Sequence, residues 1–250
     1  MSPTMKHCKI LTKNVDEMLV PMRELVSKLS IRQCMPQIEV AVGGDGRTAL
    51  VFRTLEAPSE ADMALLLEFG RVHNADIWLQ PKGPESAHAV LPENENALGL
   101  SLSEFGVRIS FKPTDFTQVN HALNETMVSR AVRLLDVQPE HKVADFFCGL
   151  GNFTMPLATR SARVIGIEGS EGLVARARQA PLKTALPKRP NSSRATSSLG
   201  AKRLAETLEA HGGIDRVLID PPREGALALS RVLAETDLRP ARVVYVSCNP

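Results

Sequence analysis

The sequence has few cysteines, and none of them forms a metal-binding pair. Its four cysteines, Cys8, Cys34, Cys148 and Cys248, lie far apart and form no CxxC motif. Closely spaced cysteines are needed for a zinc knuckle and for the disulfide framework of a small secreted domain. The sequence therefore encodes neither kind of scaffold by itself.

Long apolar runs and a strong net charge are also missing. A membrane-spanning helix needs about eighteen consecutive apolar residues, and no stretch approaches that length. The start, MSPTMKHCK, lacks the apolar run of a signal peptide. The formal net charge of +2 is compatible with nucleic acid as a partner but does not require it. We expect a globular, cytoplasmic protein, monomeric and not bound to a membrane.

The character of the chain changes near residue 112. Before it, IEVAVG (38–43) and TALVFRTL (48–55) flank a Gly-Gly-Asp-Gly turn, which predicts a β-hairpin. A helical stretch near 59–73 and the short strands DIWLQP and GVRISF follow. We predict a small α+β domain over residues 1–112.

Beyond residue 112, helices alternate with short apolar strands. KVADFF, ARVIGIE, RVLIDPP and ARVVYVSC predict strands, and NETMVSRAVRLL, 170–180 and 225–236 predict helices between them. This βαβ alternation is typical of a parallel, doubly wound sheet covered by helices. We therefore predict an α/β fold for residues 113–250, preceded by the smaller α+β domain.

The loop after the first of these strands has the features of a cofactor site. It reads DFFCGLGNF (145–153), and Gly149 and Gly151 let the backbone turn tightly beside a ligand. The next strand ends at Glu168, whose carboxylate can accept hydrogen bonds from ribose hydroxyls. The loop differs from the GxGxxG pyrophosphate cradle, so a nucleoside without a pyrophosphate is favoured, with S-adenosylmethionine as the candidate. The alternative is a plain glycine turn beside a surface glutamate.

Two further strand ends carry side chains with chemical potential. In IDPPREG (219–225) the prolines end the strand and expose Asp220 and Arg223. In YVSCNP (245–250) Cys248 ends the last strand, at the edge of the sheet where Asp220 is expected. The alternatives are a solvated Arg223 and a Cys248 that serves as a small buried hydrophobe.

Four ordered motifs, FKPTDFTQVN (111–120), DFFCGLGNF, IDPPREG and YVSCNP, resemble the RNA uracil-5-methyltransferases. Their order and spacing are most similar to the RlmD-type branch, which methylates 23S ribosomal RNA. The resemblance covers nearly the whole chain and implies a class I S-adenosylmethionine-dependent, Rossmann-like methyltransferase. It implies that Cys248 is the nucleophile, adding to C6 of a uridine so that C5 can be methylated. It assigns the contacts with S-adenosylmethionine to five residues: Gln118, Phe147, Asn152, Glu168 and Asp220.

The sequence departs from this family's pattern at both ends. The pattern continues past SCNP to a carboxylate that removes the C5 proton, whereas this sequence stops at Pro250. We therefore expect methyl transfer without release of the RNA. MKHCKIL resembles the segment with the last of four cysteine ligands of a 4Fe-4S cluster, which makes Cys8 a lone remaining ligand. One thiolate cannot hold such a cluster, so we interpret the chain as truncated at both ends.

A third departure lies at residues 181–198. A doubly wound fold needs another strand here, and the family carries an Asn near the adenine, but PLKTALPKRPNSSRATSS has the composition of a loop. Read in a shifted frame, Lys183 to Ser198 can encode the expected family pattern. Our hypothesis is a local frameshift, and the alternative is a divergent loop.

Other functions stay open at this point. A methyltransferase that acts on amino groups also uses an Asp-Pro-Pro element, but it needs no thiolate, so the SCNP motif argues against it. A non-catalytic remnant that binds S-adenosylmethionine or RNA is the second alternative. Members of the family that act on transfer RNA and on ribosomal RNA share these motifs, so the target uridine stays open.

Overall fold

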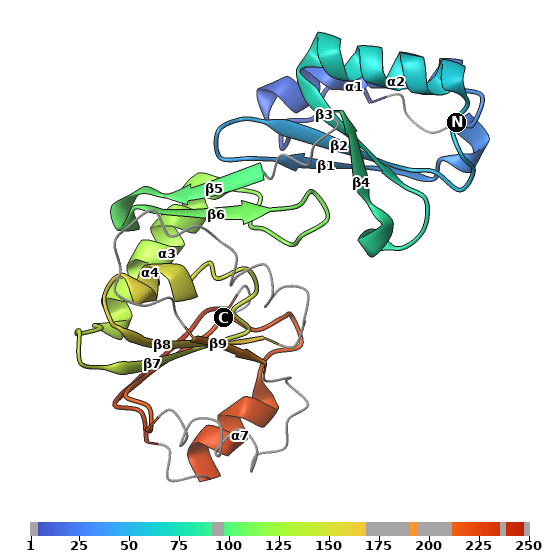
Figure 1. Ribbon diagram of the computed structural model, residues 1–250. Coiled ribbons are helices and arrows are strands. Elements are labelled where there is room, and N and C mark those ends of the chain that lie inside the picture. Colours follow the sequence, from blue (N-terminus) through green and yellow to red (C-terminus); the bar gives the residue numbers. More distant parts are fainter. Residues whose placement is uncertain (1–4, 92–97, 169–190, 195–211, 236–238, 248–250) are drawn as a thin grey trace. The chain divides into compact units, whose positions relative to one another are not determined.

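The computed structural model describes residues 5–91, 98–168, 191–194, 212–235 and 239–247 (Figure 1). The chain divides into two compact units. Unit 1 comprises Met1–Leu100 and Ser110–Val119, and unit 2 comprises Ser101–Ile109 and Asn120–Pro250.

Unit 1 is built on a four-stranded mixed sheet in the order β1-β2-β3-β4. Its strands are β1 (Gln37–Val42), β2 (Thr48–Arg53), β3 (Ala75–Gln80) and β4 (His88–Leu91). β1 and β2 pair antiparallel, with Gln37 opposite Arg53, so the predicted hairpin is confirmed. β3 joins β2 in parallel, and β4 pairs antiparallel with β3.

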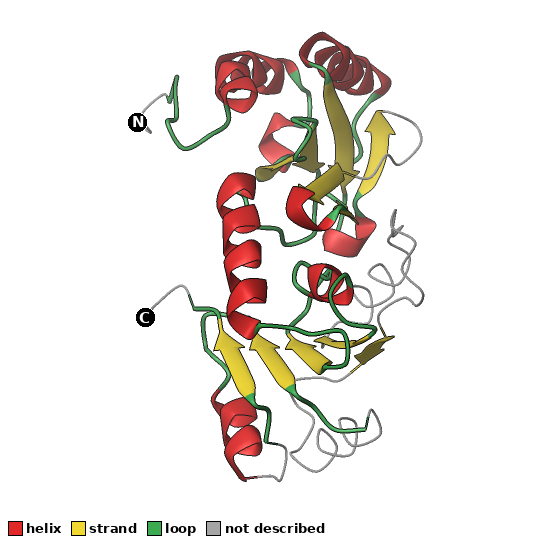
Figure 2. Cartoon of the chain, turned by 90° about the vertical axis from the view of Figure 1, so that its left-hand side faces the viewer, coloured by secondary structure: helices red, strands yellow, loops and turns green. Residues whose placement is uncertain are grey.

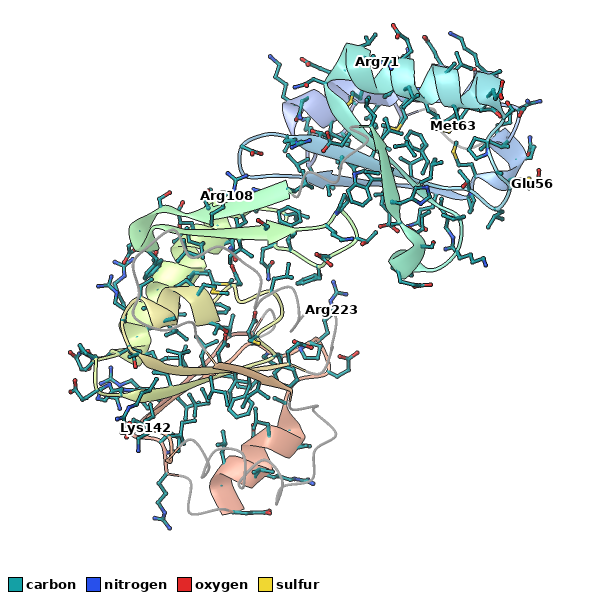
Figure 3. All side chains as sticks on the ribbon, in the orientation of Figure 1. Glu56, Met63, Arg71, Arg108, Lys142 and Arg223 are labelled. Atoms are coloured by element: carbon teal, nitrogen blue, oxygen red, sulfur yellow. The ribbon has the colours of Figure 1, made fainter. Side chains whose placement is uncertain are left out.

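Two helices, α1 (Lys13–Lys28) and α2 (Glu60–His73), pack on this sheet (Figure 1). The predicted helix near 59–73 is confirmed, and it begins at a capping box in which Ser59 and Asp62 exchange side chain to backbone hydrogen bonds. On α2, Met63 packs against the core while Arg71 is exposed (Figure 3). Phe52 and Trp78 are buried in unit 1, as a packing role predicts.

Short elements complete the chain up to residue 111. β5 (Leu98–Leu102) and β6 (Val107–Phe111) form a two-stranded sheet, which confirms the predicted strand GVRISF. Single turns of 3₁₀ helix occupy Arg32–Cys34, Pro84–Ser86 and Ser103–Phe105. No helix in the described part of the chain is long and apolar enough to span a membrane.

Unit 2 contains a five-stranded parallel sheet in the order β11-β10-β7-β8-β9. Its strands are β7 (Lys142–Phe146), β8 (Arg163–Glu168), β9 (Asn191–Arg194), β10 (Arg216–Ile219) and β11 (Arg242–Tyr245). Helices α3 (His121–Leu135) and α4 (Thr154–Ala158) cover one face, and α7 (Leu227–Glu235) lies on the other (Figures 1 and 2). The predicted doubly wound α/β architecture is therefore confirmed.

Strand alternation divides unit 2 into two layers. Phe146, Ile167 and Ile219 point to the face where they pack with Leu229 and Val232 of α7. Asp145 and Gly166 stand opposite each other in adjacent strands and share the other face, under α4. Because successive side chains of a strand alternate between faces, β7 places an apolar core on one side and a polar residue on the other.

Two sequence expectations for unit 2 need correction. The segment expected to be a loop contains β9, whose four residues pair in parallel with Ile165–Glu168 of β8. Asn-Ser-Ser-Arg has a low β-propensity, so the strand conformation of this segment depends on its hydrogen bonds with β8. The last strand ends at Tyr245, earlier than the predicted ARVVYVSC. The predicted helix 170–180 and the remainder of the suspected frameshift lie outside the described residues.

Candidate active site

The loop after β7 folds back onto the end of β8. The backbone N–H groups of Phe147 and Cys148 both donate to the carbonyl of Ile167, at 2.9 and 3.2 Å. Phe147 has a φ of 62°, and Gly149 and Gly151 have φ values of 53° and 95°. A bulky residue with positive φ is strained. The two hydrogen bonds to Ile167 therefore hold the loop in one conformation, and Gly149 and Gly151 allow the positive φ angles that this conformation needs.

Glu168 closes the loop from the neighbouring strand. The backbone N–H of Gly149 donates to Glu168 Oε2 at 3.0 Å, and the Glu168 side chain is half-buried at the carboxyl end of β8. The carboxylate predicted to hold a ribose is thus fixed to the glycine loop that follows the first strand of the unit.

Asp145 lies beneath the loop and is completely buried. Its Oδ2 accepts a hydrogen bond from Thr154 Oγ1 of α4 at 2.5 Å, while Oδ1 is buried and has no hydrogen-bond partner among the described residues. Burial raises the pKa of Asp145 to about 7, and the nearby charges of Asp220 and Glu168 act in the same direction. An oxygen atom that is buried without a hydrogen-bond partner is unusual in a folded protein.

Asp220 lies at the same edge of the sheet. Its backbone N–H donates to the carbonyl of Phe146 at 3.3 Å, directly after β10 ends. Burial raises the pKa of its carboxyl group to about 6. Asp145, Glu168 and Asp220 form what we call the acidic cluster, and such a cluster favours a ligand that carries positive charge.

Gly166 allows the loop and α4 to pack closely on β8. A Cβ atom at this position would lie 2.9 Å from Cys148 Sγ and 3.0 Å from Thr154 Oγ1. Cys148 is buried, and burial strongly raises the pKa of its thiol. Since a nucleophilic cysteine needs a thiolate, Cys148 serves as a small packing residue rather than as a nucleophile.

Sequence reasoning missed two polar residues at this site. Thr154 is the hydrogen-bond donor to Asp145. Asn124 of α3 exchanges two hydrogen bonds with Asn152, and both measure 2.9 Å. The sequence does contain a signal for Asn124, because this amide lies on the same helix face as Val128, Ala131 and Val132 and is therefore expected to be buried.

A family model described as "tRNA (Uracil-5-)-methyltransferase" matches residues 97–250. A protein of Cupriavidus metallidurans named 23S rRNA (uracil(1939)-C(5))-methyltransferase RlmD is 51% identical over 255 residues, covering 98% of this chain and 53% of that protein. A protein of Ralstonia pickettii with the same name is 49% identical over 258 residues, covering 98% of this chain and 55% of that protein. This chain belongs to the RNA uracil-5-methyltransferase family. It spans about half the length of the curated relatives it matches.

Solved structures agree with the family's fold. A Pyrococcus abyssi tRNA (uracil-54, C5)-methyltransferase in complex with S-adenosyl-L-homocysteine has a TM-score of 0.67 at 20% identity, covering 98% of this chain and 60% of that one. An M. jannaschii tRNA m1G37 methyltransferase has a TM-score of 0.51 at 10% identity, covering 90% of this chain and 62% of that one. The predicted class I methyltransferase fold is thus confirmed.

The structure brings together four of the residues that the family resemblance assigned to S-adenosylmethionine. Phe147 and Asn152 belong to the loop after β7, and Glu168 and Asp220 follow neighbouring strands at the same edge. The fifth, Gln118, lies in the part of the sequence that links β6 to α3. It is half-buried and belongs to unit 1. Their contacts with the ligand stay predictions.

Three further residues that the sequence analysis singled out are Cys248, Arg223 and Cys8. Cys248 is outside the described residues, and Arg223 is exposed in the loop after β10 (Figure 3). The backbone N–H of Cys8 donates to Asp16 Oδ1 at 2.6 Å. Within the described ranges, no three His, Cys, Asp or Glu side chains are grouped so that they could hold a metal ion.

Proposed function

We propose that the protein methylates C5 of a uridine in 23S ribosomal RNA with S-adenosylmethionine as the methyl donor. The observation that carries this proposal is the glycine loop held to Glu168 at the carboxyl end of a parallel sheet, in a chain about half identical to proteins named for this reaction. Ligands of doubly wound folds bind at this edge of the sheet.

The residues present fit S-adenosylmethionine. The acidic cluster suits the positive charge of its sulfonium and ammonium groups. We propose that Glu168 accepts hydrogen bonds from the ribose hydroxyls and that Phe147, Asn152 and Asp220 complete the site in unit 2. The contact of Gln118 with the ligand is a proposal that rests on the family resemblance alone. When bound, the ligand supplies an electrophilic methyl group.

Cys248 would perform the covalent step. Its thiolate adds to C6 of the uracil, and the electron pair of the C5–C6 double bond makes C5 nucleophilic toward the methyl group. After methylation, loss of the C5 proton to a base re-forms the double bond and expels the thiolate. A uracil must leave its stack to react in this way, so an unpaired or flipped uridine is the expected target.

A trapped adduct tests this proposal directly. We would incubate the protein with S-adenosylmethionine and 23S ribosomal RNA fragments that contain 5-fluorouridine, then analyse the denatured protein by mass spectrometry. Fluorine at C5 blocks the final elimination, so the assay needs no C5 base. We expect a methylated RNA adduct on Cys248.

Two variants provide the controls for this assay. Cys248→Ala should abolish the adduct, and Cys148→Ala should retain it because the Cys148 side chain is buried within the loop after β7. An intact adduct in Cys248→Ala, or no adduct in the parent protein while a full-length relative reacts in parallel, would refute the proposed activity.

Transfer RNA is the second candidate substrate. The matching family model and the Pyrococcus abyssi structure are both named for transfer RNA. The same trapping assay with fluorinated transfer RNA distinguishes the two, since we expect the 23S fragments to react faster.

Three narrower assignments complete the proposal. We place the boundary between the smaller domain (1–112) and the methyltransferase domain (113–250) between β6, which ends at Phe111, and α3, which begins at His121. We expect the protein to act in the cytoplasm as a monomer, and light scattering after gel filtration would measure its oligomeric state. For Cys8 we propose the role of a 4Fe-4S ligand that is insufficient alone, so anaerobic reconstitution of this chain should give no cluster absorbance.

A further inference from the structure

We propose that Asn124 of α3 is a positioning residue that fixes the carboxamide of Asn152 for the methyl donor. This inference rests on the proposed function, in which Asn152 contacts S-adenosylmethionine. It adds a residue from a different element, 28 positions earlier in the chain.

The two carboxamides form a closed, reciprocal pair. Asn124 Nδ2 donates to Asn152 Oδ1 at 2.9 Å, and Asn152 Nδ2 donates to Asn124 Oδ1 at 2.9 Å. Rotation of the Asn152 amide alone by half a turn would set donor against donor and acceptor against acceptor. Both hydrogen bonds would be lost together, so the orientation of the Asn152 amide is tied to that of Asn124.

Burial makes this coupling strong. Asn124 is 2% exposed, and a buried amide that loses its partner pays for its desolvation without compensation. Asn is an unfavourable residue in a helix interior because its side chain competes with the backbone. Its presence on the buried face of α3 is accounted for by the pair with Asn152.

The pair leaves Asn152 with capacity for a ligand. Each carboxamide has two N–H donors and an oxygen with two lone pairs, and the pair uses one donor and one lone pair of each. Asn152 is half-buried and directly follows Gly151, which has a φ of 95°, in the loop after β7. One N–H and one lone pair of Asn152 therefore remain for a ligand in that loop, in a direction set by Asn124.

A double-mutant cycle on affinity for S-adenosylhomocysteine tests the inference. We expect Asn124→Ala and Asn124→Asp each to weaken binding about tenfold, measured by titration calorimetry, because Asp cannot donate to Asn152 Oδ1. In an Asn152→Ala background, Asn124→Ala should cause less than a twofold further loss, since its target is already gone.

Val128→Ala is the matched structural control. Val128 is also buried on α3, one turn after Asn124, and its truncation destabilises the helix packing without touching the pair. We expect its affinity to stay within about twofold of the parent. Equal losses from Val128→Ala and Asn124→Ala, or additive losses in the double mutant, would overturn the positioning role.

A measurement without ligand separates this inference from the proposed function. The side-chain N–H signals of Asn152 should exchange with water about tenfold faster in Asn124→Ala than in the parent or in Val128→Ala. Unchanged exchange would refute the inference even if the protein binds S-adenosylhomocysteine. Absence of binding by the parent, with the exchange difference present, would refute the proposed ligand and leave the amide pair established.

Discussion

At the scale of single residues, the site is dominated by the buried carboxyl group of Asp145. Thr154 donates a hydrogen bond to its Oδ2, and burial raises its pKa to about 7. A carboxyl group with a raised pKa holds its proton in the folded state at a pH where the unfolded chain has lost it. The stability of unit 2 should therefore depend on pH through Asp145, in addition to Asp220, whose pKa burial also raises.

The first prediction concerns this pH dependence. Below about pH 4 the contribution of protonated Asp145 is fully present, and it falls by about 1.4 kcal/mol per pH unit as pH rises toward about 7. Asp145→Asn removes this slope. By urea unfolding, we expect the variant to gain about 2–3 kcal/mol relative to the parent between pH 5 and pH 8.

Asp62→Asn is the control for this experiment. Hydrogen bonds from Ser30 and Ser59 lower the pKa of Asp62 to about 2, so its contribution changes only below its ordinary pKa. The difference between Asp62→Asn and the parent should be equal at pH 5 and pH 8. A constant difference for Asp145→Asn as well would contradict the assignment of a raised pKa.

A second prediction concerns Thr154. Thr154→Val keeps the shape of the side chain but removes the side-chain hydrogen bond to the buried Asp145 Oδ2, which should cost about 1–3 kcal/mol in the free energy of unfolding. Thr154→Ser keeps the hydroxyl and should lose less. Equal melting temperatures for the Val variant and the parent would show that the hydrogen bond contributes nothing.

At the scale of elements, the close approach of the loop, α4 and β8 depends on Gly166. Gly166→Ala would place a methyl group 2.9 Å from Cys148 Sγ and 3.0 Å from Thr154 Oγ1. Overpacking of this kind costs about 1–3 kcal/mol, which chemical denaturation would measure. Adding Cys148→Ala removes one of the two contacts and should recover part of the loss, whereas Cys148→Ala alone should not stabilise the protein.

The elements of the sheet differ in how far the sequence predicts them. β7, β8 and β10 are short, mostly apolar and largely buried segments, so local pattern alone predicts them. β9 has no such pattern, and it is a strand because β8 offers an unpaired edge to it. Long-range pairing of this kind leaves no trace in the composition of the segment itself.

Helix α1 was missed for a different reason. Its buried residues Val15, Met18, Met22 and Leu25 recur at the spacing of a helical face, but Pro21 lies inside the helix. Proline normally ends a helix because it lacks an N–H and its ring clashes with the preceding turn. Packing against the unit 1 sheet outweighs that cost, which the sequence does not reveal.

The candidate site was predicted in part for similar reasons. Glu168 and Asp220 end strands, and that position is readable from the pattern of a parallel sheet. Asn124 and Thr154 act through contacts with residues 28 and 9 positions away, and only the folded chain shows those contacts.

At the scale of the whole molecule, each unit has a hydrophobic core of its own. One core is formed by residues of α1, α2 and the first sheet, and the other by residues of β7, β8, β10 and α7. Separate cores favour separate unfolding transitions.

A fourth prediction follows from these separate cores. In calorimetry, S-adenosylhomocysteine at a hundred times its Kd should raise the melting temperature of unit 2 by about 5–10 °C and leave unit 1 nearly unchanged. An equal shift of both transitions would show that the ligand stabilises the two units together. Asp220→Ala, which removes one carboxylate of the cofactor edge, should reduce the shift.

The strand order of unit 2 has a consequence for its synthesis on the ribosome. β7 is the central strand, yet its neighbour β10 comes much later in the chain. The backbone N–H of Lys142, at the start of β7, donates to Asp215, which directly precedes β10 and lies 73 residues further along the chain. A nascent chain therefore exposes one edge of β7 until β10 has been made, and the apolar side chains that pack against α7 until Glu235 has been made. Chaperones that hold unfolded chains should bind this protein during that interval, and slow codons between β8 and β10 should lower its yield of folded product.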